Sequence, residues 1–388
     1  MRLEDICTVF TDGDWIESKD QDNEGIRLIQ TGNIGEGTYL EKETRAKYIS
    51  EDTFNKLKCT EIFPGDILVS RLPEPVGRAC IIPETEARMI TAVDCTICRP
   101  NESIVYNEYL CYFMRSKAYY TKLLGSVTGT TRKRISRKNL GNVELYIPSK
   151  QEQEGVVKQL DCLVKIINLR DKEIQLLDDF IKARFVEMFG TLNSPSQEFT
   201  KATLKELCNK ITDGKHGGCK VEKGTERYFI GAREIYDDEV HYDTAPEINV
   251  DEFEKDYKRC NIEIGDFLIV NTGATIGKSA ITTDERTEHT LLQKSVALLK
   301  VKKELLNPVF LKWCYRVNMQ MYIVESASAQ PNLLLSKINS TVIYVPDIEL
   351  QNQFADFVHQ VNKSKVAVQK ALDETQLLFD SLMQQYFG

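Results

Sequence analysis

The sequence predicts a mixed α+β protein in which one architecture occurs twice: a globular α/β unit followed by a long amphipathic helix. Three observations predict it. Short motifs recur in the same order about 200 residues apart. Apolar, β-branched runs alternate with helical patterns inside each copy. Each copy ends in a stripe of apolar residues spaced three and four apart, which is typical of a coiled coil.

The duplication rests on an ordered series of matches rather than on one motif. The matched pairs are Thr11-Asp12-Gly13 with Thr212-Asp213-Gly214, residues 63–70 with 263–270, Gly77-Arg78 with Gly277-Lys278, Asn107-Glu108 with Asn307-Pro308, Tyr146-Ile147-Pro148 with Tyr344-Val345-Pro346, and Phe189-Gly190 with Phe387-Gly388. Their separations lie between 198 and 201 residues. A series that keeps its order and its spacing indicates two copies of one unit.

Local patterns predict the same elements in both copies. These are buried strands opened by Gly-Asp (GDILVS and GDFLIV) within 63–70 and 263–270, helices over 107–124 and 307–324, and alternating strands ended by Pro over 142–148 and 340–346. Asn107 and Asn307 are the expected N-caps of the two helices, and Pro308 suits a first helical position. Strands and helices are therefore interspersed within each globular unit.

Each copy closes with a helix of about 40 residues, over 151–189 and 349–387. The expected seam residues are Leu160, Leu163, Ile167, Ile174, Leu177 and Ile181 in the first helix, and Val358, Val361, Val368, Leu372 and Phe379 in the second. A small domain alone cannot bury so long a stripe, so we expect the helices to pair, antiparallel. Matched positions are often complementary, since Ile167 corresponds to Lys365 and Arg170 to Val368.

The chain therefore divides into four segments: a globular unit over 1–150, a long helix over 151–190, a second globular unit over 191–348 and a second helix over 349–388. A length of 388 residues is enough for two domains, each with its own core. Joined by paired helices, the two globular units form a pseudo-symmetric pair.

Composition fits a protein of the cytoplasm. No apolar run is long enough to span a bilayer, and the N-terminal MRLEDICTVF lacks the pattern of a signal peptide, so we expect no membrane association. The 11 cysteines are scattered among apolar residues, which suits reduced thiols. Cys95 and Cys98 form the one close pair. Without a second such pair we expect them in a strand rather than in a zinc site.

Charge is unevenly distributed. The net charge of −8 argues against nucleic-acid binding by the chain as a whole. Residues 115–138, however, hold eight cations and no acid, whereas residues 234–256 are mostly acidic. The sequence thus separates basic from acidic surface.

Residues 271–279, NTGATIGKS, resemble a phosphate-binding loop but do not fit one. Only three residues separate Gly273 from Gly277, and the residues that follow favour a strand rather than a helix. The matched segment of the first copy keeps neither Gly273 nor Ser279. We therefore expect a turn between strands here, and no ATP binding.

Other catalytic motifs are missing from the sequence. There is no Pro-Pro pair, which a methyltransferase needs in the tetrapeptide that holds a flipped base. No Gly-x-Ser-x-Gly elbow occurs, and the four histidines are dispersed. We accordingly expect no catalytic residue, no metal ligand and no cofactor bound by this chain.

Binding chemistry is better represented. The loop GTTRKRISRKNL (129–140) carries five cations, and its counterpart AQPNLLLSKINS (329–340) carries amides instead. Arg and Lys reach phosphates or guanine, whereas Gln and Asn pair with adenine. The candidate DNA-contacting residues are Arg71, Arg132, Lys133, Arg134, Arg137 and Lys138 in the first copy, and Lys215, His216, Asn271, Gln330, Asn332 and Lys337 in the second. For Arg71, Asn271, Lys215 and His216, an ordinary surface role is an equal alternative.

Taken in order, these motifs resemble those of the specificity subunits of type I restriction–modification systems. The resemblance rests on Thr-Asp-Gly, the Gly-Asp strand, Gly-Arg or Gly-Lys, the loop motifs Gly-Thr-Thr-Arg and Ala-Gln-Pro-Asn, and the spacing Pro-x4-Gln (Pro148 to Gln153, Pro346 to Gln351) before a helix ending in Phe-Gly. It covers essentially the whole chain. The single motifs are loose, and the architecture carries the specificity.

The resemblance implies two target recognition domains, over 1–150 and 191–348, each reading one half of a bipartite, asymmetric site on double-stranded DNA. The two helices would form a coiled coil that acts as a ruler. The subunit would itself be non-catalytic. It would dock two methyltransferase subunits and, through them, restriction subunits, and those partners would hold S-adenosylmethionine, ATP and Mg²⁺. Because the two loops differ, we expect two different half-sites.

Three alternatives stay open at this point. The chain could be a specificity subunit of a related methylation-based defence system. It could be a coiled-coil adaptor whose domains bind proteins, with the basic loop incidental. It could also be an enzyme of a kind that the motifs do not reveal.

Overall fold

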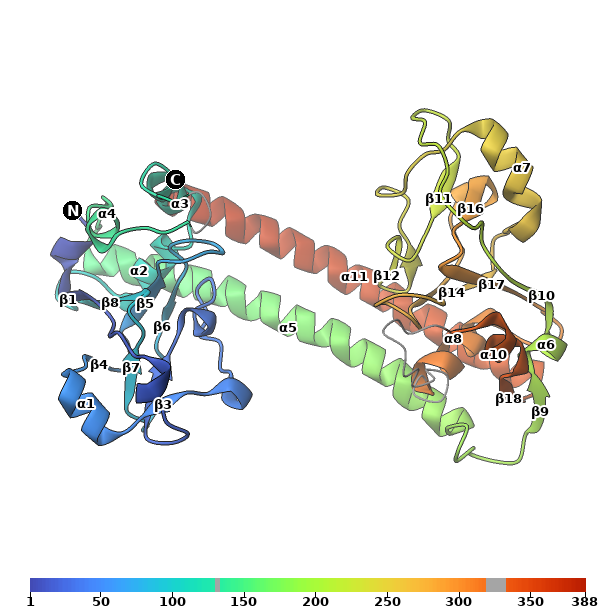
Figure 1. Cartoon of the computed structure of the whole chain (residues 1–388), viewed down its shortest axis with the longest axis horizontal. Coiled ribbons are helices and arrows are strands. Elements are labelled where there is room, and N and C mark those ends of the chain that lie inside the picture. The colour runs from blue at the N-terminus through green and yellow to red at the C-terminus, as the bar shows by residue number, and fades with distance from the viewer. Residues whose placement is uncertain (130–132, 319–332) are drawn as a thin grey trace. The chain divides into compact units, whose positions relative to one another are not determined.

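A computed structural model describes residues 1–129, 133–318 and 333–388. The chain forms two compact units (Figure 1). One consists of Met1–Asp171 with Lys370–Gly388, and the other of Lys172–Gln369. Both units mix strands and helices, so the predicted α+β class is confirmed.

The first unit is built on an antiparallel sheet of four strands in the order β1-β8-β5-β6. Their bounds are Cys7–Asp12 for β1, Cys95–Pro100 for β8, Ile67–Ser70 for β5 and Ala79–Ile81 for β6. Every residue of β5 is buried, as the Gly-Asp pattern predicts. Cys95 and Cys98 lie in β8 as buried free thiols, which confirms the strand expected there.

The second unit repeats this sheet in the order β10-β17-β14-β15. The strands span Cys208–Asp213 for β10, Val296–Val301 for β17, Phe267–Val270 for β14 and Ser279–Ile281 for β15. Even the irregularity in the first strand recurs, between Cys7 and Val9 in one unit and between Cys208 and Lys210 in the other. The phosphate-loop look-alike joins the antiparallel strands β14 and β15, as expected of a turn.

A parallel strand pair accompanies each sheet. In the first unit β2 (Ile26–Ile29) pairs with β7 (Met89–Thr91), flanked by β3 (Tyr48–Ile49) and β4 (Glu61–Ile62). In the second unit β11 (Tyr228–Ile230) pairs with β16 (Thr290–Leu292). There β12 (Ile235–Tyr236) and β13 (Glu239–Val240) form a separate hairpin.

The shorter elements are α1 (Glu51–Leu57), α6 (Leu204–Leu207), α7 (Val250–Cys260), and the 3-10 turns Glu4–Ile6, Ser18–Asp20, Thr31–Asn33, Glu43–Arg45 and Glu285–His289.

The Gly-Asp motif is a structural device in both copies. Asp66 accepts a hydrogen bond from the Phe63 amide at 2.9 Å and pairs with Arg99 of β8 at 2.8 Å. Asp266 does the same with the Glu263 amide at 2.8 Å and with Lys300 of β17 at 2.7 Å. Burial raises the pKa of the Asp266 carboxyl, and Lys300 opposes that rise. The motif thus joins the turn to the neighbouring strand.

The single helix predicted over 107–124 is two helices, α2 (Asn107–Phe113) and α3 (Lys117–Leu124). Ser116 ends the continuity because its hydroxyl caps α3, accepting from the Tyr119 amide at 3.1 Å. Asn107 is not the N-cap, which is Tyr106; its side-chain amide donates to the Gly65 carbonyl instead.

The matched helix of the second unit, α8 (Pro308–Val317), starts as predicted. Asn307 accepts a hydrogen bond from the Val309 amide at 2.8 Å, and Pro308 occupies the first helical position. The part of the prediction over 319–324 lies outside the described residues.

The Pro-ended strand is present in one unit and absent from the other. In the second unit β18 (Val342–Val345) pairs with β9 (Thr200–Thr203). In the first unit residues 142–148 form only a bridge between Glu144 and Arg2, so the predicted strand is wrong there. The neighbouring backbone is that of residues 1–3, and its hydrogen bonds, such as Leu145 N–H to the Met1 carbonyl, make a single bridge rather than a ladder.

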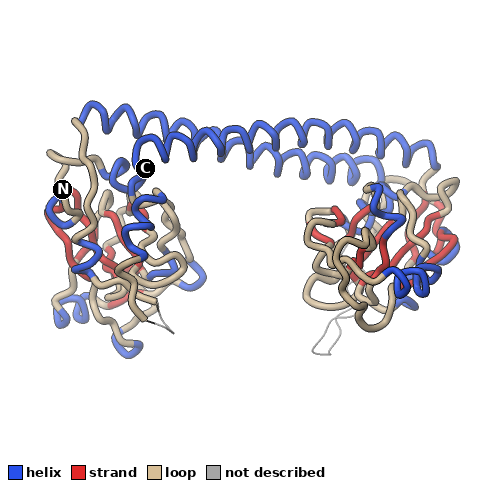
Figure 2. Tube along the Cα trace, turned by 90° about the horizontal axis from the view of Figure 1, so that it is seen from above, coloured by secondary structure: helices blue, strands red, loops and turns tan. Residues whose placement is uncertain are grey.

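The two long helices are α5 (Lys150–Phe189) and α11 (Ile348–Phe387), each of 40 residues. Within each unit, the segments of the two helices lie side by side and run in opposite directions (Figures 1 and 2). All eleven predicted seam residues are buried or partly buried. The predicted antiparallel pairing of the helices is therefore confirmed.

Polar residues in the seam have partners across it. In the first unit Arg170 donates to the Ala371 carbonyl and to the Thr375 hydroxyl. In the second unit Lys365 pairs with Asp178 at 2.8 Å. Cations therefore lie within the apolar seam without remaining unpaired.

Aromatic side chains attach each pair of helices to its own globular part. In the first unit Phe387 packs on Tyr109, with ring centres 5.2 Å apart. In the second unit Phe185 packs between Phe310 and Phe354, at 5.6 and 5.3 Å. The helix ends therefore belong to the cores of the globular parts.

A buried glutamine fixes the start of each long helix. The side chain of Gln153 accepts from the Tyr106 amide and donates to the Ile104 and Pro148 carbonyls, each at 2.9 Å. Gln351 makes the equivalent three bonds, to the Asn307 amide at 2.9 Å and to the Leu305 and Pro346 carbonyls at 3.0 and 2.7 Å. Both side chains are 0% exposed. This explains the Pro-x4-Gln spacing.

Gln153→Ala should lower the free energy of unfolding by about 2 to 4 kcal/mol, because it leaves a buried N–H and two carbonyls without their partner. Urea unfolding followed by circular dichroism measures it. Gln151→Ala, at an exposed position of the same helix, is the control and should change stability by less than about 0.5 kcal/mol. Equal effects from the two variants would contradict this role.

Candidate nucleic-acid interface

One end of the first sheet collects three charged residues. Asp12 ends β1, Arg71 follows β5, and Asp94 precedes β8. Because these strands are antiparallel neighbours, the last residues of β1 and β5 lie beside the first residues of β8. The Arg71 amide donates to the Asp94 carbonyl at 2.9 Å, which ties two of these connections together.

The basic loop is anchored at this end of the sheet. Ile135 is fully buried, and its amide donates to the Arg71 carbonyl at 3.2 Å. Arg134 and Thr128 exchange two backbone hydrogen bonds of 2.9 Å. The short helix α4 (Arg137–Gly141) follows at once, capped by Ser136. The backbone on both sides of Ile135 is therefore fixed.

The side chains around Ile135 point outward. Lys133, Arg134, Arg137 and Lys138 are all exposed. Two of them have acidic partners: Arg134 pairs with Asp94 at 3.0 Å, and Arg137 lies 3.8 Å from Asp12. Arg132, predicted with them, lies outside the described residues.

Arg71, in contrast, lies in the interior and is only 5% exposed. Its guanidinium pairs with Asp12 at 3.4 Å and donates to the Val93 carbonyl. Burial lowers the pKa of Arg71, and Asp12 opposes that fall. The contacts of Arg71 in this structure are structural, so we do not count it among the exposed DNA candidates.

The second unit anchors its loop in the same way. The Asn271 amide donates to the Ser295 carbonyl at 3.0 Å, and the Leu333 amide donates to the Asn271 carbonyl at 2.7 Å. Asn271 is 4% exposed, so its place is structural like that of Arg71. Lys337, in α10 (Leu335–Ser340), is exposed. Gln330 and Asn332 lie outside the described residues.

The Lys215-His216 pair is divided between two environments. Lys215 lies between Asp256 at 2.8 Å and Glu252 at 3.3 Å, and its hydrogen bond to Asp256 is the main reason that its pKa is raised. This cation is therefore neutralised within the protein. His216 is exposed, 3.9 Å from Asp213.

Sequence reasoning missed Arg259. It ends the last turn of α7, and its guanidinium donates to the backbone carbonyl of Asp213 at 2.9 Å as well as to the Asp213 carboxylate. In the sequence Arg259 follows the mostly acidic segment 234–256, so the local charge does not indicate a cation with a functional role. The one available signal was that Asp213 matches Asp12, the residue that holds arginines in the first unit.

The Thr-Asp-Gly motif positions this carboxylate. A Cβ atom on Gly13 would lie 2.3 Å from the Thr91 carbonyl oxygen, and one on Gly214 would lie 2.1 Å from that of Leu292. Real Cβ atoms do not approach so closely, so only glycine lets the first strand pass the parallel pair. The motif, weak as a single match, thus has a steric cause in both copies.

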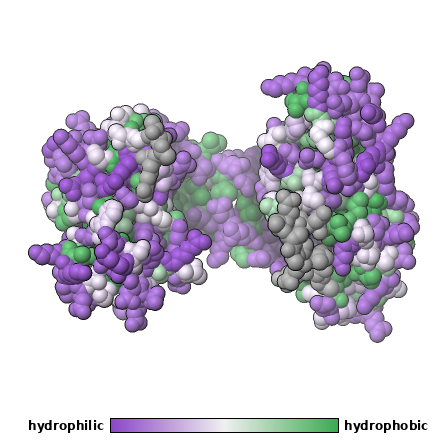
Figure 3. Space-filling view, in the orientation of Figure 1, coloured by the Kyte–Doolittle hydropathy of each residue, from purple (hydrophilic) through white to green (hydrophobic). Residues whose placement is uncertain are grey.

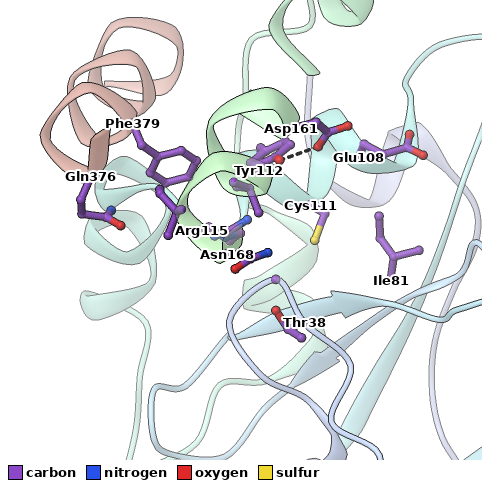
Figure 4. A pocket seen from close by; sticks show the side chains of 13 residues that line it. Thr38, Ile81, Glu108, Cys111, Tyr112, Arg115, Asp161, Asn168, Gln376 and Phe379 are labelled. Carbon is purple, nitrogen blue, oxygen red and sulfur yellow. Dashed lines mark hydrogen bonds between the residues drawn. The ribbon is translucent and has the colours of Figure 1, made fainter. Parts of the chain in front are cut away.

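A cavity of about 350 Å³ lies elsewhere in the first unit (Figure 4). Tyr112 donates a 2.6 Å hydrogen bond to Asp161, and mainly burial raises the pKa of Tyr112. Arg115 lies over the rings of Tyr112 and Phe379, 5.2 and 5.4 Å from their centres. None of the predicted DNA-contacting residues lines this cavity.

Hydrophilic side chains cover most of the face of each unit shown in Figure 3. Among the described residues, no group of three or more His, Cys, Asp or Glu side chains is arranged to hold a metal ion. Within the same part of the chain, none of the helices has both the length and the apolar character needed to cross a membrane.

Fold and site define a protein of two similar α/β domains, each carrying an anchored loop at one end of its sheet. The family model for the type I restriction modification DNA specificity domain matches residues 1–178 and again residues 196–375. The chain therefore belongs to this family, and the duplication predicted from the sequence is confirmed.

Two curated relatives are similar to this chain. The type I restriction enzyme EcoBI specificity subunit of Escherichia coli is 22% identical over 297 residues, which cover 69% of this chain and 61% of that protein. A putative type I restriction enzyme MjaX specificity subunit of Methanocaldococcus jannaschii is 21% identical over 231 residues, 58% of this chain and 52% of that protein. The matches thus span between half and two thirds of these relatives' own lengths.

Two solved structures share the fold. The S subunit of a type I restriction-modification system from M. genitalium aligns with a TM-score of 0.53 at 15% identity, covering 100% of this chain and 95% of that one. A chain from a study of complex assembly and conformational transition of the type I R-M system aligns with a TM-score of 0.62, also at 15% identity, covering 100% and 96%.

Gly214→Ala should destabilise the second unit by more than about 2 kcal/mol, because its Cβ meets the Leu292 backbone. Gly218→Ala is the matched control, since no atom lies within 4 Å of a Cβ there; it should be neutral or slightly stabilising. Urea unfolding of the two variants makes the comparison. A Gly214→Ala protein as stable as Gly218→Ala would refute the steric explanation.

Proposed function

We propose that the chain is the DNA sequence-specificity subunit of a type I restriction–modification complex, and that each globular domain reads one half of a bipartite site. One observation carries the proposal: both domains anchor a loop by the same hydrogen bond, to the residue after the buried strand. These bonds run from Ile135 to Arg71 and from Leu333 to Asn271. A common anchor with different exposed side chains is what reading two different sequences requires.

The two half-sites differ because the loops differ. The first loop offers Lys133, Arg134, Arg137 and Lys138, which suit phosphates and guanine. The second loop has Lys337 as its exposed cation within 333–340, and amides precede it in sequence. The recognised site is therefore asymmetric rather than palindromic.

The chain itself is non-catalytic in this proposal and binds no cofactor. Two methyltransferase subunits supply methyl transfer with S-adenosylmethionine, and restriction subunits join through the assembled complex with ATP and Mg²⁺. The complex works in the cytoplasm on double-stranded DNA. Support comes from family membership and from a sequence without methyltransferase, hydrolase or phosphate-loop motifs.

The long helices supply the surface on which the methyltransferase subunits dock. Several apolar side chains of these helices are half or more exposed: Leu169, Leu377 and Leu378 in the first unit, and Leu176, Phe180 and Val366 in the second. The seam is already filled by the helix pairing, so these side chains are available to a partner.

Deleting the gene should remove methylation at one bipartite adenine-containing motif throughout the host genome and leave other motifs unchanged. Genome-wide mapping of methylated adenine, with the gene restored in trans as the control, measures this. The loss of no motif would refute the proposal. Genomic neighbours decide between a type I system and a related methylation-based defence system.

Replacing Lys133 and Lys138 with Ala should weaken binding of the assembled complex to every DNA sequence. Each lost phosphate contact should lower the slope of log affinity against log salt by about 0.9. Affinity measured by fluorescence anisotropy at several salt concentrations gives the slope. The control is Lys56→Ala, at an exposed position of α1 that lies outside both loops and outside the long helices. An unchanged slope in the Lys133/Lys138 variant would favour the protein-binding adaptor instead.

A further inference from the structure

We propose that Arg134 and Arg137 of the first domain read guanine, and that Asp94 and Asp12 are the positioning residues that aim them. This inference rests on the proposed function and names the base that the first half-site contains. It starts from a difference among exposed cations. Arg134 and Arg137 each have a carboxylate partner, whereas Lys133 and Lys138 form no ion pair with any described residue.

The arginines keep part of their hydrogen-bonding capacity free. The side chains of Arg134 and Arg137 are 45% and 47% exposed, although each lies beside an acid. A guanidinium is a planar fork with five N–H donors, so a carboxylate on one edge leaves donors on the other. Guanine presents two acceptors, O6 and N7, at the spacing of that fork in the major groove.

The neighbouring acids also disfavour the other ligand that an arginine takes on DNA, a phosphate. Asp94 lies 3.0 Å from Arg134, so an approaching phosphate meets a negative charge beside the guanidinium. Uncharged base acceptors meet no such repulsion. The unpaired lysines suit phosphates, and the carboxylate-held arginines suit bases.

The carboxylate of Asp12 and the backbone of Asp94 are themselves held in place. Asp12 accepts from the Thr96 hydroxyl at 3.0 Å and pairs with the buried Arg71 at 3.4 Å. The Asp94 carbonyl accepts from the Arg71 amide at 2.9 Å. The backbone carbonyl of Arg71 accepts a hydrogen bond from the Ile135 amide. One buried residue therefore connects both aspartates to the loop. A side chain that is already oriented loses less freedom on binding.

The same carboxylate position holds an arginine in the second domain. Asp213, the counterpart of Asp12, takes the guanidinium of Arg259, whose side chain is 44% exposed. That arginine comes from α7 and not from the loop. The carboxylate therefore recurs while the arginine it holds differs, as expected of a positioning residue that serves two specificities.

The test uses the assembled complex with its methyltransferase subunits and a library of randomised duplexes, from which bound DNA is selected and sequenced. Arg134→Ala should weaken the preference for a G·C pair at one position by about 10- to 100-fold. Arg137→Ala should do so at another. Arg134→Lys, which keeps the charge but lacks the fork, should lose the same preference.

Asp94→Asn tests the positioning role. It should reduce the preference at the position read by Arg134 without lowering the salt slope of binding, since no phosphate contact is lost. Lys133→Ala is the matched control: it should lower affinity for all sequences equally and lower that slope by about 0.9. Thermal unfolding checks that each variant is folded; if Asp94→Asn does not fold, Arg134→Lys alone decides between guanine and phosphate.

Two results would overturn the inference. Arg134→Ala and Arg137→Ala could lower affinity uniformly with a smaller salt slope, which would assign both to phosphates. They could also leave every base preference of the wild-type complex intact. A wild-type complex without any sequence preference is a different result, since it refutes the proposed function itself.

Discussion

The burial of one apolar stripe is the constraint on which the rest of this structure depends. A helix of 40 residues with leucines and isoleucines along one side cannot leave them in water, and a small α/β domain cannot cover all of them. The two helices therefore cover each other. The glutamine at the start of each helix then makes the helix an extension of its domain. In the first unit the three hydrogen bonds of Gln153 join α5 to the backbone just before α2 and to Pro148.

In both domains, polar residues at matched positions fix how the strands and turns lie against one another. Asp66 with Arg99, and Asp266 with Lys300, hold a turn against the neighbouring strand. A buried carboxylate needs a hydrogen-bonded partner, so each aspartate fixes the position of the strand that carries that partner. What varies between the copies is the exposed chemistry carried on this frame, since side chains in water bear few packing constraints. A frame held in this way can carry loops of different sequence.

Much of the fold could be predicted because its signals are local. The Gly-Asp strands and the seams are periodic patterns, and the repeat places them twice. One failed prediction missed a local signal, and another depended on a distant partner. The continuous helix over 107–124 fails at Ser116, whose hydroxyl caps a new helix. The strand over 142–148 fails because the backbone beside it pairs with it only through one bridge, between Arg2 and Glu144, whereas residues 200–203 pair with β18 along four residues in the second unit.

The sequence by itself determined the duplication, the fold class and the helix pairing, because periodicity and spacing are properties of neighbouring residues. Only the tertiary structure decided which charged residues face water. The sequence offers Arg71 and Arg134 equally as exposed arginines. In the structure Arg71 lies within the domain, while Arg134 stays exposed beside Asp94. Arg259 reaches Asp213 from 46 positions away. Exposure and ion pairing depend on residues brought together by the fold, and no local pattern records them.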